Sequence, residues 1–376
     1  MAEALAERGK IKMIPISKPY IGPEEMDAVM EVMKSGMIAQ GPKVRQFEES
    51  IANYCRAKHA IAVNSGTAAL HASLYAAGIG PGDEVITVPF TFAATANSVI
   101  MQNAKPIFCD IEEKTFNIDP GQVEKHITKK TKAILPVDLY GQAYDVDAIR
   151  EIAAKHSLKI IEDACQAIGA EYRGRRAGTF GDIGAFSFYA TKNIATAEGG
   201  MIVTDNAEYA EQARRFRHHG QSEQTRYEYF DLGYNYRMTD IQAAIGIEQL
   251  KRLEDWVKKR IGNARFLTEK LSKIEGIIPP AVKPQCRHVF HQYTIRIKGF
   301  KLSRDEVTSS LKQKGIGTGV YYPKPLHMHP FYAKMGYKEG MFPVSEQASR
   351  EVVSLPVHAS LSQDDLSAIA AAFEEM

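Results

Sequence analysis

Short apolar runs alternate with helix-like segments through the first half of the chain, and this alternation constrains the fold more than any other feature. The runs are rich in β-branched and aromatic residues, as strands buried on both faces of a sheet require. They cover residues 60–66, 83–89, 105–111, 132–138, 158–164, 183–189 and 200–205, with helix-like segments at 67–78, 93–103 and 145–157. The pattern predicts an α/β fold with a mostly parallel seven-stranded sheet flanked by helices. Ligands of such sheets bind where the strands end.

The second part of the chain has a different pattern, starting near Met238. Apolar residues at helical spacing, with charges opposite them, predict one long connecting helix. It is followed by an apolar run at 291–297, a helix-like segment at 303–315 and a last helix from Ser362. We expect a large domain over residues 1–250 and a small C-terminal α/β domain over residues 251–376.

The overall charge gives no basis for binding nucleic acid, because 47 basic and 45 acidic residues leave a net charge of +2. The four cysteines are far apart and the eleven histidines show no ligand spacing, so we expect neither a disulfide framework nor a metal site. The first residues are charged, and no apolar run nears the ~20 residues that span a bilayer. The expectation is a soluble, cytoplasmic protein without a membrane partner.

Three stretches carry candidate chemistry, and each has an ordinary structural explanation when taken alone. "NSGTAAL" (64–70) reads as a strand end, Gly66 and a helix start, which suits a bound phosphate or an N-cap by Ser65 or Thr67. "IIEDACQA" (160–167) ends a strand with Asp163, a catalytic carboxylate or a cap. "SFYATKNIATAEGG" (187–200) holds Lys192, an amine nucleophile or a surface lysine.

Together these stretches match the requirements of pyridoxal 5'-phosphate (PLP). The cofactor needs a lysine amine for its Schiff base, a carboxylate for its ring nitrogen, a helix start with hydroxyls for its phosphate and a flat side chain against its ring. Lys192 lies 29 residues after Asp163, so two neighbouring strands can present both to one pocket. Thr67 with Ser187, and Phe92 in "PFTFAAT" (89–95), supply the remaining groups.

The chain also resembles the DegT/StrS family of nucleotide-sugar aminotransferases, PLP enzymes of the aspartate-aminotransferase fold (fold type I). The resemblance runs from about Ile14 to the C-terminus. It rests on "NSGTAAL", "VPFTFAAT", "PVDLYGQ", "IIEDACQA", "GAFSFYATKN", "YNYRMTDIQAAIG" and "YYPKPLH".

The resemblance implies a role for each matching position. Lys192 would be the Schiff-base lysine and proton shuttle, and Asp163 the partner of the pyridine nitrogen. Asn235 would reach the cofactor phosphate of a neighbouring subunit, which implies a homodimer with shared active sites. The remaining implied contacts are Gly66, Thr67, Ala68 and Ser187 with the phosphate, Phe92 and Gln166 with the ring, and Arg237, Tyr321 and Tyr322 with the substrate.

The family pattern implies an aminotransferase that moves an amino group from glutamate onto a 3- or 4-keto nucleotide sugar, with pyridoxamine 5'-phosphate as the second form of the cofactor. Family members often have histidine at Asp138, glycine at Ala197 and histidine at Tyr321, so these positions, which we expect to border the substrate, leave the sugar open. The alternatives are amination of a non-nucleotide keto-cyclitol and a non-catalytic regulator that binds PLP or a sugar. A nicotinamide-dependent enzyme is disfavoured, because no G-x-G-x-x-G follows the first strand.

Overall fold

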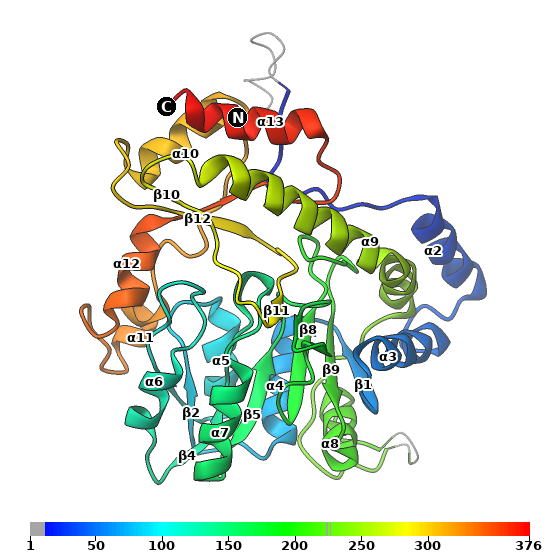
Figure 1. The fold of residues 1–376 in the computed structure, drawn as a ribbon. Coiled ribbons are helices and arrows are strands. Elements are labelled where there is room, and N and C mark those ends of the chain that lie inside the picture. Colours follow the sequence, from blue (N-terminus) through cyan, green and yellow to red (C-terminus); the bar gives the residue numbers. More distant parts are fainter. Residues whose placement is uncertain (1–11, 223–224, 226) are drawn as a thin grey trace.

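The computed structural model describes residues 12–222, 225 and 227–376, and a seven-stranded sheet lies at its centre (Figure 1). The strand order is β1-β9-β8-β5-β4-β2-β3. Four neighbouring pairs, from β8 to β3, are parallel, whereas β9 runs antiparallel to both β1 and β8. Each predicted run overlaps one strand, which confirms the fold class. The strands are β1 (His59–Val63), β2 (Glu84–Thr87), β3 (Lys105–Phe108), β4 (Thr131–Ile134), β5 (Lys159–Asp163), β8 (Ile183–Ser187) and β9 (Gly200–Thr204).

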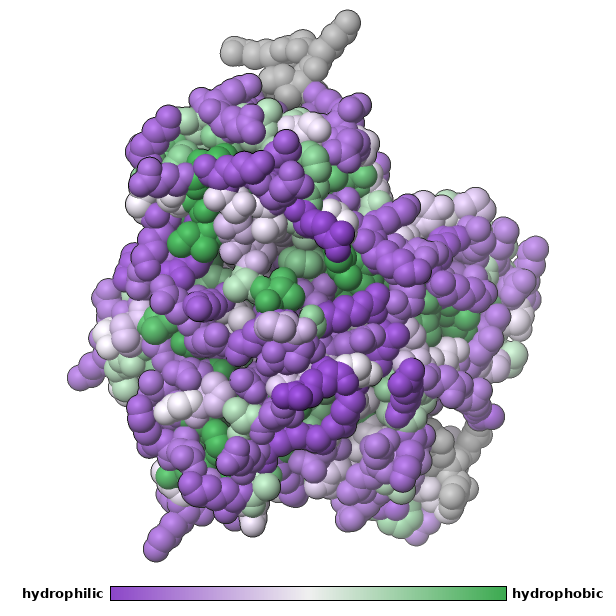
Figure 2. Space-filling model, viewed as in Figure 1, coloured by the Kyte–Doolittle hydropathy of each residue, from purple (hydrophilic) through white to green (hydrophobic). Residues whose placement is uncertain are grey.

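Both faces of this sheet are buried, because successive residues of a strand point to opposite sides. In β1, Ala62 packs into a core that includes residues of α3, α7 and α9. Its neighbour Ile61 packs into a second core with residues of α4 and α8. The covering helices are α3 (Pro42–Cys55), α4 (Gly66–Ala76), α5 (Ala93–Met101), α7 (Val146–His156) and α8 (Ala207–Arg217), with the short α6 (Pro120–Val123) beside them. The surface in the same view is mostly hydrophilic, and the apolar residues that show form separate patches (Figure 2).

The long helix α9 (Asp240–Leu271) joins the two parts of the structure (Figure 1). It starts with a capping box in which Thr239 Oγ1 accepts from the amide of Gln242, and α2 (Pro23–Ser35) packs against it. Its first half contributes Leu253 to the main core, and its last turns contribute Leu267 to a third core. That third core lies under the sheet β10-β12-β13. The small part contains β10 (Ile277–Ile278), β12 (Tyr293–Ile297), β13 (Val352–Leu355), α10 (Arg304–Gln313), α11 (Pro330–Ala333), α12 (Pro343–Glu351) and α13 (Gln363–Glu374).

The expected boundary at residues 250/251 falls inside α9, and a strand from beyond it pairs with the first part. β11 (Cys286–Arg287) joins β6 (Glu171–Tyr172), which in turn pairs with β7 (Arg175–Arg176). The division into domains over 1–250 and 251–376 therefore stays a prediction. None of the helices in the described ranges is long and apolar enough to cross a bilayer.

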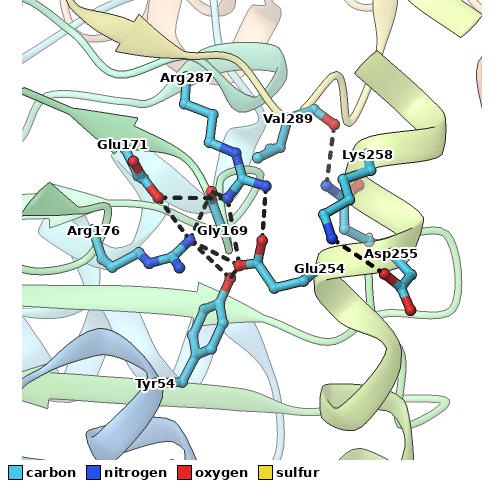
Figure 3. A network of polar contacts seen from close by, with 10 residues as sticks. Tyr54, Gly169, Glu171, Arg176, Glu254, Asp255, Lys258, Arg287 and Val289 are labelled. Atoms are coloured by element: carbon cyan, nitrogen blue, oxygen red, sulfur yellow. Dashed lines mark hydrogen bonds and ion pairs between the residues drawn. The ribbon is translucent and has the colours of Figure 1, made fainter. Parts of the chain in front are cut away.

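A network of charged side chains ties α9 to these short strands (Figure 3). Glu254 of α9 lies 2.7 Å from the Arg287 guanidinium and 2.9 Å from that of Arg176, and it accepts a 2.6 Å hydrogen bond from Tyr54 Oη. Burial opposes ionisation of Glu254, but the hydrogen bonds from Arg287 and Tyr54 outweigh it and lower the pKa of this carboxyl to about 2.

Candidate active site

A cavity of about 450 Å³ lies at the edge of the sheet where β5 and β8 end. Asp163 and Ser187 are the last residues of these adjacent parallel strands, and the antiparallel β9 begins at the same edge with Gly200. Side chains from the C-terminal part close the other side. The predicted site residues that line the cavity are Gly66, Thr67, Phe92, Asp163, Gln166, Ser187, Lys192, Tyr321 and Tyr322.

One end of the cavity is formed by the N-terminus of α4. Ser65 caps this helix, and its Oγ accepts a 3.1 Å hydrogen bond from the amide of Ala68. The Ala68 amide is therefore already paired, and Ala68 is not among the residues that line the cavity. The amides of Gly66 and Thr67 have no partner in the described part of the chain. A Cβ on Gly66 would lie 2.7 Å from Ser187 Cβ, so only glycine lets the helix start approach the end of β8. The N-cap and the anion site predicted for this stretch are thus compatible.

The opposite wall holds Asp163. Its Oδ2 accepts a 2.7 Å hydrogen bond from Thr95 Oγ1, and its Oδ1 accepts one of 3.2 Å from the amide of Cys165. Glu162 points to the other face of the sheet, as the alternation of side chains predicts, where it accepts a 2.7 Å hydrogen bond from the amide of Phe180. Only Asp163 of this acidic pair therefore reaches the cavity.

Lys192 lies in the loop after β8, where its amide donates to the carbonyl of Tyr189 in a turn. Its Nζ forms no hydrogen bond or ion pair with the residues that the structure describes. Burial lowers the pKa of this amine, and the neighbouring Cys165 and Asp163 only partly oppose the shift. The arrangement favours a reactive amine over a surface lysine.

The aromatic and amide side chains complete the cavity. Phe92 is 59% exposed although it is large and apolar, and its ring lies 6.5 Å from that of Tyr322. Gln166 accepts a 2.8 Å hydrogen bond from the amide of Tyr140 and donates one of 3.3 Å to Tyr322 Oη. Tyr140 Oη in turn donates to the carbonyl of Tyr321. The exposed ring of Phe92 and the hydrogen-bonded residues Tyr321 and Tyr322 could therefore pack against a flat ligand.

Asn235 and Arg237 do not line this cavity. They lie on a segment that pairs with the end of β1 and with the residue that follows α8. Arg237 bridges to Val63 at the end of β1, and Asn235 bridges to His218. The guanidinium of Arg237 contacts the imidazole of His218. Asn235 is exposed, and within one chain it does not reach the cavity. The roles implied for these two residues stay predictions.

The sequence reasoning missed several residues of the wall. One of them is Thr95 in "PFTFAAT", whose hydroxyl binds Asp163. The signal in the sequence is its spacing from Thr91, because side chains four residues apart lie on the same side of a helix start. His291 is 93% buried and lies on the segment before β12, and burial together with the nearby Lys192 lowers its pKa well below the usual value. No motif signals that this distant segment folds beside Lys192.

Asp138 is a correction, because the expectation that it borders the substrate is wrong. It is fully buried and is not part of the cavity wall. Val137 pairs with Asp163 across the sheet, so Asp138 turns to the face of Glu162, where its Oδ1 accepts from the amide of Tyr144 at 3.1 Å. Burial and the adjacent Glu162 raise its pKa. Of the other two departures, Tyr321 lines the cavity as expected, whereas Ala197 does not line it and has φ +67° in the left-handed region.

Comparisons with known proteins agree with this geometry. The family model of the DegT/DnrJ/EryC1/StrS aminotransferase family matches residues 19–374. The chain is 46% identical to the pleiotropic regulatory protein of Geobacillus stearothermophilus, covering 94% of this chain and 95% of the relative. It is 40% identical to the GDP-perosamine synthase of Caulobacter vibrioides, covering 96% and 98%.

A solved structure shows the same fold. The S. venezuelae protein DesV, determined in complex with a ketimine intermediate, superimposes with a TM-score of 0.90 at 39% identity over 94% of each chain. Because the family model and these relatives cover nearly the whole chain, the expected enzyme class, an aminotransferase, is confirmed. The chain belongs to the DegT/DnrJ/EryC1/StrS aminotransferase family.

Proposed function

We propose that this aminotransferase uses PLP to move an amino group from glutamate onto the 3- or 4-keto carbon of a nucleotide sugar. The observation that carries the proposal is the Lys192 amine, which has no partner among the described residues and lies in a cavity between the start of α4 and Asp163. The amine, the acid and the helix start come from a loop, a strand end and the N-terminus of a helix, which are far apart in the sequence.

The residues of the cavity fit PLP. The amides of Gly66 and Thr67, which no described residue accepts from, suit a phosphate together with the helix dipole and the Ser187 hydroxyl. Phe92 offers an exposed aromatic face, and Lys192 would hold the aldehyde carbon of the cofactor covalently. Bound PLP supplies an electron sink that stabilises negative charge on the carbon next to the amino group.

The chain's own residues would control protons around that sink. Asp163, oriented by Thr95, would keep the proton on the ring nitrogen. Lys192 would move a proton to and from the substrate carbon through Nζ. Because burial lowers its pKa, a larger fraction of this amine is neutral near pH 7 than for an exposed lysine, and the neutral form is the one that accepts a proton.

We also propose that two copies of the chain share their active sites. Asn235 is exposed beside the cavity, where a side chain can reach a neighbouring subunit. The apolar residues Met26, Met30 and Met33 are each more than half exposed and recur at the helical spacing of α2, and the exposed Met37 follows just after the end of this helix. A row of exposed methionines of this kind is typical of a surface that a partner covers.

The proposed substrate class is supported by the relatives and by the residues that line the cavity. The synthase from Caulobacter vibrioides is named for a GDP-linked sugar. Tyr321 and Tyr322 line the cavity, and Arg237 pairs with Val63 two residues before Ser65 of its wall, so these residues would contact the sugar nucleotide. Glutamate is the donor that the family pattern implies.

Two measurements test this function. Purified protein should absorb as a PLP enzyme, and borohydride should fix the cofactor on Lys192. It should then aminate at least one 3- or 4-keto nucleotide sugar when glutamate is supplied. Amination of a keto-inositol alone would replace the substrate class with a keto-cyclitol. A colourless protein that takes up no added PLP would leave the chain as a non-catalytic member of its family.

A further inference from the structure

A second, smaller cavity lies next to the main cavity, and Lys192 lines both. It has a volume of about 40 Å³, and we call it the back chamber. Lys18, Asn193, Trp256, Arg260 and His358 bound it together with Lys192. A volume of this size exceeds the roughly 10–15 Å³ that one water needs, so the chamber has room for a small polar group. Of the residues that the structure describes, Lys192 alone lines both cavities.

The back chamber is cationic. Lys18 stands at its exposed rim, Arg260 of α9 at its buried wall and the Lys192 amine between the two cavities. Among the described residues that line it, none is acidic. A buried cation without an anionic partner is unfavourable, because desolvation is not compensated by an opposite charge.

Arg260 is the residue of this chamber best placed to bind an anion. Its side chain is 93% buried, and burial alone lowers its pKa to about 10. Only Nη1 has protein partners in the described part of the chain, the carbonyl oxygens of Phe290 at 3.0 Å and His291 at 3.5 Å. Nε and Nη2 therefore remain for another acceptor, and no carboxylate of the described chain supplies one.

Two buried acceptors of the same chamber also lack partners. Asn193 donates from Nδ2 to the carbonyl of Val289 at 3.4 Å, which leaves its Oδ1 unpaired. His358 Nε2 lies 3.2 Å from the carbonyl of Pro15 and so carries the proton, which leaves Nδ1 as an unpaired acceptor. Both atoms are enclosed by protein, so the groups that the chamber offers to a ligand are the donors of Arg260 and Lys18, which suit a carboxylate.

We propose that the back chamber is the subsite for a carboxylate group of the amino donor, with Arg260 and Lys18 as its ligands. This inference rests on the proposed function, because it places the donor beside the amine that would exchange with it. The carboxylate would accept hydrogen bonds from Arg260 Nε and Nη2, and Lys18 would close the rim.

The chain provides its own probe, because Trp256 is its single tryptophan and lines the chamber. Glutarate, a dicarboxylate without an amino or keto group, would be titrated into the holoenzyme while Trp256 fluorescence and heat of binding are recorded. We expect saturable binding that changes the fluorescence. Arg260→Gln and Lys18→Gln should each weaken it roughly tenfold or more, as loss of a charge-assisted pair does, and Arg260→Lys should weaken it less.

Lys258→Gln is the matched control, because Lys258 is an exposed cation on the same helix outside the chamber. It should bind glutarate as the wild type does. Lys18→Gln decides the question should Arg260→Gln fail to fold, since Lys18 is exposed. Equal weakening by Lys258→Gln, unchanged binding in both chamber variants, or binding of chloride as tight as that of glutarate would each overturn the proposal. A protein that binds glutarate in this way but aminates no nucleotide sugar would refute the substrate class and leave the subsite standing.

Discussion

Thr95 and Asp163 form a buried hydrogen bond of 2.7 Å between Oγ1 and Oδ2, although the two residues come from different helix and strand ends. Thr95 Oγ1 is itself 2.9 Å from Thr91 Oγ1, so Asp163 is held by a chain of two hydroxyls. The carboxylate that would face the cofactor ring is thereby fixed in one orientation.

Replacing Thr95 should impair catalysis without removing the acid. Thr95→Val keeps the shape and deletes the hydroxyl, and it should slow the half-reaction with glutamate by about tenfold, the effect of ~1.4 kcal/mol. It should also lower the free energy of unfolding by about 1–2 kcal/mol. Thr95→Ser retains a hydroxyl and should stay near wild type in stopped-flow and urea unfolding measurements. Equal loss in the serine variant would assign the effect to packing.

Lys192→Ala should abolish transamination while leaving the phosphate end of the site able to bind PLP. The reason is that the amine would hold the aldehyde and move the proton, whereas the Gly66 and Thr67 amides are untouched. Borohydride should then fix no cofactor to the protein, as mass spectrometry of the digest would reveal. Turnover above background in this variant would refute the assignment of Lys192. Asp163→Asn should still be labelled at Lys192 but turn over slowly.

Mixing two inactive variants tests the shared site. Subunits with Lys192→Ala and subunits with Asn235→Ala should form hybrid dimers that contain one intact site each. Random exchange would restore about a quarter of the wild-type activity, since half of the dimers are hybrid and half of their sites are intact. Each variant refolded alone serves as the control. Sites that lie within single chains would give no recovery on mixing.

Stability in acid should depend on Glu254. Its folded pKa of about 2 lies below the ordinary value of 4.5, so it stabilises the fold above pH 4.5 and this contribution is lost as the pH falls from 4.5 toward 2. Glu254→Gln should lower the free energy of unfolding at pH 7 and flatten its decline across that window, as measured by urea unfolding at a series of pH values. Asp255→Asn is the control, because Asp255 is exposed and, among the described residues, pairs only with Lys258 in a 3.5 Å contact. The same change in both variants would contradict a specific role for Glu254.

Ala197→Gly should not destabilise the protein, unlike most alanine-to-glycine changes. Ala197 has φ +67°, which costs an L-residue about 1–2 kcal/mol, whereas glycine loses about 0.5–1 kcal/mol through its freer unfolded chain. The free energy of unfolding should therefore rise by up to about 1 kcal/mol. Ala57→Gly, at a loop position without positive φ, should lower it. A loss of stability in Ala197→Gly would show that the alanine methyl group packs usefully.

The sequence by itself determined the strands and the residues that end them. Strands buried on both faces must be nearly continuous in hydrophobicity, so each run could be located, and parallel strands bring their carboxyl ends to one edge. Position along the chain alone therefore predicted that Asp163 and Ser187 lie at two such ends. It also predicted that Lys192 lies in the loop between Ser187 and β9. The helix start at Gly66 followed in the same way, because local hydrogen bonding decides a cap.

Only the tertiary structure decided which side chains meet across long separations. In the sequence, Asp138 and Asp163 each lie at the end of a predicted strand, which suggests that both face the same site. The pairing of Val137 with Asp163 instead turns the Asp138 side chain to the opposite face of the sheet. His291, Arg260 and Lys18 come from three distant segments, and only the packing of α9 and the segment before β12 brings them to Lys192. The periodicity of a sequence indicates which face of a helix or strand is buried, but it does not indicate which segment packs against that face. The charge of the back chamber depends on which segments pack together.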